Sequence, residues 1–345
     1  MALHQIIQRV LLFGVRLHTT ASPPPPQPPK ELAGLIDSVA PAHRDFDQRA
    51  MYYGNRYRSG FWAIYLLSAL AVLFAVLPLA LGWDSKTNTV RPLAAVWAVC
   101  EVLVIFTLGG IYWLGHRRDW QGQWLTARTT AELSWYLPLV APLVDFTQTS
   151  ATTNWYLRVF DPGQNLRSAG DVDLLCERSE PQARAALVDA WSDPAFIRSY
   201  ALWTAAVLDG QKHYHHRVAV RQHALLHRVH GLNNWLFGLT AVSSLMHLLV
   251  HSMWLSLITM FFPALGASLH GALAQSEAYR LGATSERLMD ELQSAIDGIH
   301  VALVPKAAAD AVTDVKAAIE SAIALILEEH QDWHMLVRPH RLPLG

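Results

Sequence analysis

The chain has 345 residues, of which 52% are hydrophobic and only 16% are charged. Soluble domains carry about 25% charged residues, so this composition, with a mean hydropathy of +0.18, indicates a polytopic membrane protein rather than a soluble one. The 27 basic and 28 acidic residues nearly cancel, which argues against nucleic acid as a partner. Cys100 and Cys176 form no CxxC pair, so neither a disulfide scaffold nor a zinc-thiolate site is expected.

Four stretches with almost no charge are long enough to cross a bilayer as helices, which takes about 20 residues. We expect these spans at residues 61–82, 93–114, 233–250 and 253–271, with a tight turn near His251 and Ser252. Lysine and arginine are concentrated at the open ends of the two resulting hairpins, before the first helix and after the second helix of each, which indicates that these ends face the cytoplasm. The expected fold is therefore an all-α integral membrane bundle with four transmembrane helices in two hairpins, long cytosolic helical extensions and both termini on the cytoplasmic side of a bacterial inner membrane.

The chain shows the same plan twice: a basic, aromatic helix, an apolar hairpin and a polar amphipathic continuation. In the first copy the hairpin is flanked by FDQRAMYYGNRYRSGFW and HRRDWQGQWLTARTTAEL. In the second it is flanked by GQKHYHHRVAVRQHALLHRVHGLNNW and QSEAYRLGATSERLMDEL. Few residues are identical between the copies, so the repeat is one of pattern.

Five segments are expected along the chain. They are an N-terminal segment and Pro-rich linker (1–44), a first two-span membrane unit (45–135), a cytosolic helical insert (136–210), a second two-span membrane unit (211–300), and a C-terminal amphipathic helix with a tail (301–345). The proline tract at 23–29 predicts an extended spacer that separates the first twenty residues from the membrane unit.

An alanine-rich helix is expected from Pro305 to about His330. Its apolar residues recur at spacings of three and four, which places them on one face. These residues are Val312, Val315, Ile319, Ala322 and Ile326. Packing against the rest of the subunit is the favoured interpretation, and a short coiled coil between subunits is the alternative.

Two motifs around the first hairpin resemble a known family. A basic, aromatic motif precedes the hairpin and a W-x-x-x-R-x-x-A-E-L motif follows it; their residues are Tyr53, Arg56, Tyr57, Trp124, Arg128, Ala131, Glu132 and Leu133. These are similar to the SLATT proteins, the SMODS and SLOG-associating two-transmembrane effector domains of bacterial conflict systems. The second half, with WTAAVLDGQKHYHHR and HRVHGLNNWLFGLT, resembles the second membrane unit of four-span relatives. The similarity covers residues 45 to 300.

The resemblance implies a membrane effector that forms pores or disrupts the membrane when a linked nucleotide-sensing domain is triggered. In the family that sensor is often a SLOG domain with a Rossmann-like fold. This sequence departs from the pattern, because no sensor domain is recognisable in it. Either the first twenty residues are the tail of such a domain, or the sensor is a separate, SLOG-like partner.

Glu101 is the one charged residue inside any expected span. A carboxylate at that depth costs several kcal/mol unless it faces a partner, a bundle interior or water. One interpretation is that Glu101 lines an ion pathway or senses protonation, in contact with Arg91 or the second hairpin. The other is that it is a protonated, hydrogen-bonded residue of the bundle core.

The chain has 17 histidines, and four of them share one helical stripe at spacings of seven, four and three. They are His216, His223, His227 and His230. Imidazoles change charge between about pH 5 and 8, so a pH-responsive cytosolic face is one hypothesis. No carboxylates lie nearby in sequence to complete a metal site, and a solvated or packed helix is the favoured interpretation.

A layer of arginines is expected next to the membrane on the cytoplasmic side. Its members are Arg49, Arg56, Arg58, Arg217, Arg221 and Arg228. Anionic lipids of the inner leaflet account for such a layer. A nucleotide-phosphate site built from these arginines is the less favoured alternative, since the sequence has no glycine-rich phosphate loop.

No GxSxG, P-loop, GxGxxG or HExxH motif occurs, so we expect neither an enzyme nor a cofactor or metal. The leading hypothesis is a homo-oligomeric membrane effector that opens a pore or depolarises the membrane in response to a partner. Two alternatives remain open: a non-conducting membrane anchor or scaffold, and a small proton-coupled ion transporter.

Overall fold

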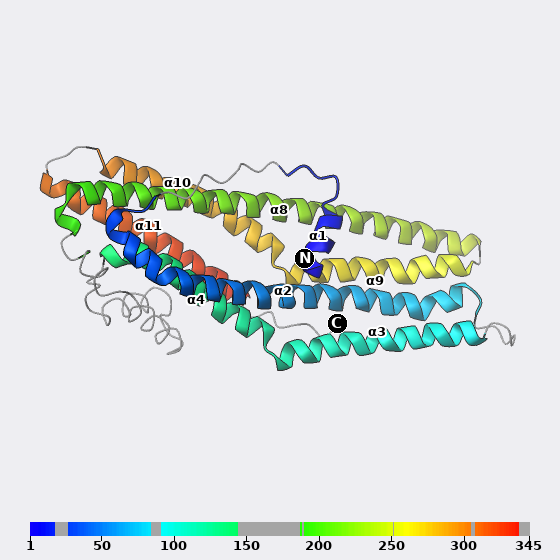
Figure 1. The fold of residues 1–345 in the computed structure, drawn as a ribbon. Helices are drawn as coiled ribbons and strands as arrows, with labels where there is room; N and C mark the ends of the chain where they lie inside the picture. The colour runs from blue at the N-terminus through cyan, green and yellow to red at the C-terminus, as the bar shows by residue number, and fades with distance from the viewer. Residues whose placement is uncertain are drawn as a thin grey trace.

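A computed structural model describes residues 1–17, 27–83, 91–143, 187, 190–250, 252–304 and 308–337. Within these ranges every element is helical (Figure 1). The α-helices are α1 (Leu3–Leu11), α2 (Lys30–Ala80), α3 (Arg91–Arg117), α4 (Trp120–Val140), α8 (Pro194–Leu249), α9 (Met253–Gln275), α10 (Ala278–Ala302) and α11 (Ala308–Val337). Two short 3-10 helices follow α4 and precede α8, at Ala141–Leu143 and Ala190–Ser192.

Two very long helices run through the whole molecule. α2 has 51 residues and α8 has 56, which at 1.5 Å per residue gives lengths of about 77 Å and 84 Å. At one end of the molecule α2 pairs with α3, and α8 pairs with α9, as two adjacent hairpins (Figure 1). At the other end the same two helices pack with α4, α10 and α11 in a second bundle.

The predicted repeat is visible as two copies of one three-helix arrangement. In each copy a long helix pairs first with an apolar helix and then with a polar one: α2 with α3 and α4, and α8 with α9 and α10. Each apolar helix is followed, two residues after its end, by an acidic residue with a left-handed backbone that precedes the polar helix, Asp119 (φ 43°) or Glu277 (φ 51°). The polar continuation of each hairpin is therefore a separate helix set at an angle, not an extension of the apolar one.

The first hairpin turn begins with a helix-ending motif at Gly82. Gly82 has φ +68°, a conformation that glycine adopts at little cost. Its N–H donates to the carbonyl of Leu79 (3.1 Å), and the N–H of Trp83 donates to the carbonyl of Pro78 (2.9 Å). This pair of bonds is a Schellman motif, and it ends the first apolar stretch where the sequence predicts.

Three helical stretches in the described ranges are long and apolar enough to cross a membrane. They are Lys30–Ala80, Ala94–Arg117 and Met253–Ala302. The last contains the stretch expected at 253–271, and the first two cover all but one or two end residues of those expected at 61–82 and 93–114. The stretch expected at 233–250 forms the end of α8 beside α9, and α8 is not among the three. Large apolar side chains on that end are nonetheless exposed, including Phe237 (76%) and Leu249 (81%).

The C-terminal helix α11 packs against the other helices of the same subunit, as its apolar spacing predicts. Val315, Ile319, Ala322 and Ile326 are all buried in a core shared with α2, α4, α8 and α10, and Val312 packs at its edge. Leu208 and Leu292 lie in the same core and are almost inaccessible to solvent. The apolar face of α11 is thus used within one chain over the residues whose side chains are described, from Val312 to Leu327.

The segment boundaries differ from the expected ones in two places. α2 already begins at Lys30, because Leu32, Leu35 and Val39 are buried against the second bundle. The described parts of the expected insert at 136–210 belong to the end of α4, the start of α8 and the short segments between them. The short helices predicted in the rest of that insert lie outside the described residues.

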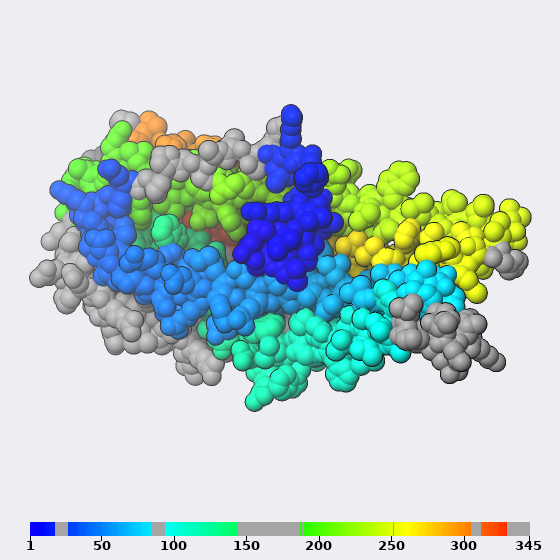
Figure 2. Space-filling model, turned by 45° about the vertical axis from the view of Figure 1, so that its right-hand side comes forward, coloured from blue at the N-terminus to red at the C-terminus, as the bar shows by residue number. Residues whose placement is uncertain are grey.

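The N-terminal segment is not held apart from the membrane unit. α1 docks across α2 and α8, where Ile7, Leu11 and Leu12 pack on their apolar core (Figure 2). Most of the proline tract predicted as a spacer lies outside the described residues. The opposite face of α1 is also apolar and faces outward, with Val10 69% and Phe13 85% exposed.

Candidate functional site

A polar cavity of about 450 Å³ lies where the two bundles meet. It separates the apolar core of the hairpins from that of the second bundle, and its walls come from α1, α2, α4, α8, α9, α10 and α11. Phe61 and Trp62, at the start of the first expected span, are among its lining residues. The hollow beside α1 opens to the surface between α2 and α8 (Figure 2). Its volume is in the range of small-molecule sites.

At one end of the cavity an ion-pair chain joins α2 to α4. Arg128 pairs with Glu132 one turn later on α4 and lies 3.5 Å from the carboxylate of Asp47 on α2. Burial raises the pKa of Glu132 above the usual range of a glutamate, although the guanidinium of Arg128 acts in the opposite direction. The two acids of this end therefore already have a cationic partner.

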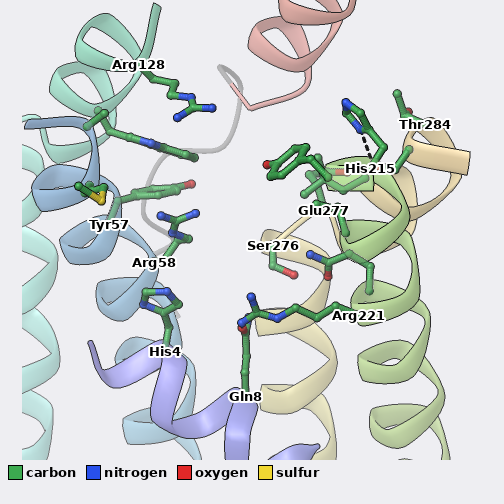
Figure 3. A pocket seen from close by; sticks show the side chains of 18 of the residues that line it. His4, Gln8, Tyr57, Arg58, Arg128, His215, Arg221, Ser276, Glu277 and Thr284 are labelled. Atoms are coloured by element: carbon green, nitrogen blue, oxygen red, sulfur yellow. Dashed lines mark hydrogen bonds between the residues drawn. The ribbon is translucent and has the colours of Figure 1, made fainter. Parts of the chain in front are cut away.

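His215 is a buried histidine of the cavity wall, with 4% of its surface exposed. Its Nδ1 lies 3.3 Å from the hydroxyl of Ser285 on α10, and its Nε2 lies 3.4 Å from the carboxylate of Glu329 on α11. One imidazole thus connects three helices of the second bundle (Figure 3). The fourth acid of the cavity, Glu277, lies 3.6 Å from the guanidinium of Arg280.

Arg58 and Arg221 face each other across the cavity from α2 and α8 (Figure 3). Arg58 donates to the carbonyl of Gly54 (3.1 Å) and stacks over the ring of Trp124 at 5.2 Å. Arg221 donates to the side-chain oxygen of Gln8 on α1. Among the described residues neither guanidinium has a carboxylate within ion-pair distance, and burial lowers the pKa of both.

α1 closes the cavity on the side of these two arginines. His4 is 5% exposed, and its backbone N–H and ring Nδ1 lie 3.4 Å and 3.2 Å from the hydroxyl of Ser59. Arg228 donates to the carbonyl of Phe13 just after α1 (3.4 Å). Polar groups of α2 and α8 therefore hold a nine-residue helix that would be marginal on its own.

Docking of α1 is expected to weaken as the pH falls. Burial, followed by the positive charges of Arg58 and Arg221, lowers the pKa of His4 to about 4. In undocked α1 that pKa returns to about 6.5. Above pH 6.5 His4 is neutral in both states, so docking is fully stable; between pH 6.5 and 4 only the undocked state takes up the proton, so acidification favours release.

A spin label at position 10, in a background with Cys100 and Cys176 replaced by serine, measures this release. Its mobility at pH 5 should exceed that at pH 7.5, and His4→Asn should remove the difference. An equally immobile label at both pH values in the His4 protein would contradict the expectation.

Two of the six predicted juxtamembrane arginines line the cavity; of the other four, two are exposed and two are partly buried. Arg49 pairs with Asp45 (2.8 Å), and Arg56 stacks over the ring of Tyr52 (4.3 Å). Arg228 holds α1, and Arg217 is partly buried on α8. Arg58 and Arg221 of the predicted layer thus line the cavity, although Arg221 is also exposed to solvent, whereas Arg49, Arg56, Arg217 and Arg228 do not line it.

The predicted histidine stripe faces outward. His223, His227 and His230 are exposed and His216 is partly buried. His223 contacts Glu286 on α10 at 3.1 Å, and His230 stacks on His270 of α9 at 6.2 Å between ring centroids. The four imidazoles converge on no common point, and the described residues contain no group of three metal-ligating side chains.

Glu101 is half-buried on α3, the helix at the edge of the bundle (Figure 1). Between residues 94 and 114 of α3, Val104 is the one buried residue. Contact of Glu101 with Arg91 lies outside what the structure describes, since that side chain is not placed. In the subunit α3 packs chiefly on α2, so Glu101 is remote from the second hairpin.

Several residues that line the cavity were not predicted as site residues from the sequence. Arg128 and Glu132 stand in the motif that carries the family resemblance, four residues apart, which already predicts an ion pair on one helix face. His215 shares a helical face with Leu208 and Ala219, at spacings of seven and four, and that period marks it as an inward residue. No local signal marks His4, because its burial depends on a distant surface.

Comparisons with family models, curated proteins and solved structures match nothing to this chain. The fold and the site therefore define only a broad class of protein. It is an all-helical protein with three helical stretches able to cross a membrane and a charged cavity where its two bundles meet.

Proposed function

We propose that the chain is a bacterial inner-membrane effector of the SLATT type, homo-oligomeric and pore-forming or membrane-depolarising. In this proposal the end of α8, at 233–250, also spans the membrane, so that α2 with α3 and α8 with α9 form two membrane hairpins. Both termini and the second bundle then lie in the cytoplasm. A separate nucleotide-sensing, SLOG-like partner supplies the trigger, and anionic lipids contact the arginines of the predicted layer that do not line the cavity.

The observation that carries the proposal is the carboxylate on the edge helix. α3 has the length and hydropathy of a membrane span, packs on little besides α2, and bears Glu101 halfway along it. A carboxylate facing acyl chains is costly, so its place on an open helix favours contact with water or with another protein surface. A second copy of the chain packed on α3 provides both, with an ion pathway between subunits.

The continuous helices supply the coupling from the cytoplasm. α2 and α8 each carry cavity residues and expected membrane residues on one rigid rod, with Arg58 only three residues before the first span. A partner or ligand that shifts the second bundle would move the membrane ends of both helices. Such bistable helix shifts are a common means of gating.

Expression in a bacterial host tests the proposal. Induction should depolarise the cells, read with a potential-sensitive dye, and arrest growth, because the pore dissipates the ion gradient. Glu101→Gln removes the charge from the pathway at nearly constant volume and should reduce depolarisation several-fold at matched membrane abundance. Thr107→Val, one to two turns further along α3, is the matched control and should depolarise like the unchanged protein.

Two results would argue against the proposal. Unchanged membrane potential on full induction would favour the non-conducting anchor or scaffold. Equal depolarisation by the Glu101→Gln variant at every pH would remove the carboxylate from the pathway.

A further inference from the structure

The acids of the cavity are all paired, whereas two of its arginines are not. Asp47 and Glu132 face Arg128, Glu329 faces His215, and Glu277 faces Arg280. Each acidic side chain lining the described cavity thus has a basic group within 4 Å. In the part of the chain that the structure describes, Arg58 and Arg221 remain as positive charges with only neutral acceptors, the carbonyl of Gly54 and the amide of Gln8.

The two guanidiniums are placed to share one ligand. They approach the cavity from opposite walls, on α2 and α8, and Figure 3 shows both at the end that α1 closes. Arg58 is held by its stacking on Trp124, and Arg221 by Gln8. Arginines present several N–H donors in a fixed plane, which suits the oxygens of a phosphate group better than a single point charge.

We propose that Arg58 and Arg221 bind the phosphate group of a ligand that occupies this cavity, and that α1 covers the site. The bound phosphate replaces Gln8 as the acceptor for Arg221. The cavity, at about 450 Å³, holds considerably more than a phosphate ion, so the ligand has a further organic part that contacts the aromatic wall of Tyr57 and Tyr214. The cavity reaches Phe61 and Trp62, at the start of the first expected span, so the phosphate group has two possible sources: the headgroup of an anionic phospholipid or a soluble nucleotide.

Binding to the full-length protein, in nanodiscs of phosphatidylcholine, tests the site. One arm titrates adenosine triphosphate and inorganic phosphate by calorimetry. The other arm adds phosphatidylglycerol to the nanodiscs and counts the molecules retained on the released protein by native mass spectrometry. We expect at least one of these probes to bind.

Four variants, with Arg287→Gln as the control, locate the binding. Arg58→Gln and Arg221→Gln should each lower affinity or retention at least tenfold, whereas Arg287→Gln, which removes the same charge from an exposed site on α10, should change it less than twofold. Gln8→Glu keeps both arginines and places a competing carboxylate beside Arg221, so it should also weaken binding. Gln8→Ala should strengthen it. Gln8→Glu keeps the test decisive if Arg58→Gln fails to fold.

The two arms identify the source. Loss of nucleotide binding in the arginine variants assigns a soluble ligand, and loss of phosphatidylglycerol retention assigns a lipid headgroup; either supports the site. No binding of any probe, or binding that is as strong in the Arg58 and Arg221 variants as in the Arg287 variant, would overturn it. These measurements use binding alone, so their outcome is independent of whether the protein conducts ions.

Discussion

Gly54→Leu is expected to separate α4 from α2 and to lower the stability of the protein. Gly54 is buried in α2, and a Cβ there would lie 2.8 Å from Nε1 of Trp124 and 3.1 Å from a guanidinium nitrogen of Arg58. Trp124 cannot move aside easily, because its ring contacts both Tyr57, stacked at 5.5 Å, and Arg58, 5.2 Å from the ring centroid. Overpacking of this kind costs about 1–3 kcal/mol and occasionally more.

Gly210→Leu is the matched control for this change. Gly210 lies inside α8 and a Cβ there meets nothing within 4 Å. Both substitutions gain the same helix propensity, about 0.8–1 kcal/mol relative to glycine, so only the clash differs between them. Thermal unfolding in detergent should show a lower Tm for Gly54→Leu and an unchanged or higher Tm for Gly210→Leu. Equal Tm values in the two variants would contradict the packing of α2 on α4.

Ile319→Asp should be the most destabilising single change in the C-terminal helix. Ile319 is fully buried, and truncation of a buried isoleucine alone costs about 2–5 kcal/mol. The aspartate adds the cost of a buried carboxylate without a partner. Ser321→Asp introduces the same charge at an exposed position two residues later and should leave the Tm nearly unchanged.

The oligomeric state distinguishes this expectation from the coiled-coil alternative. If α11 joined subunits, Ile319→Asp would dissociate the oligomer and leave the Tm of the subunit intact. Packing inside the subunit predicts the opposite: the Tm falls, while the mass of the oligomer is unchanged below the unfolding temperature. Light scattering and thermal unfolding on the same sample separate the two.

Hydropathy located the three helical stretches that are able to cross a membrane, because that signal is local. Charge-free runs located the apolar parts of α2, α3 and α9, and the turn after α8 lies where expected, between Leu249 and Met253. The apolar spacing of α11 likewise predicted its inward face, including Val315 and Ile319. In these cases the residues that decide the structure are neighbours in the sequence.

The cavity could not be predicted in the same way. Arg58, Arg128 and Arg221 come together only because α2, α4 and α8 line the same cavity. Spacing placed four histidines on one face of α8, but it does not state which face points inward, and the buried imidazole is that of His215. The docking of α1 depends on Ser59, Arg221 and Arg228, all far from it in the sequence.

Conductance of the purified protein in a planar bilayer tests the proposed pore most directly. A pore between subunits predicts discrete current steps whose amplitude falls in the Glu101→Gln variant and persists in Thr107→Val. A silent bilayer, with protein shown to be folded and inserted in the same lipid, would contradict a conducting effector.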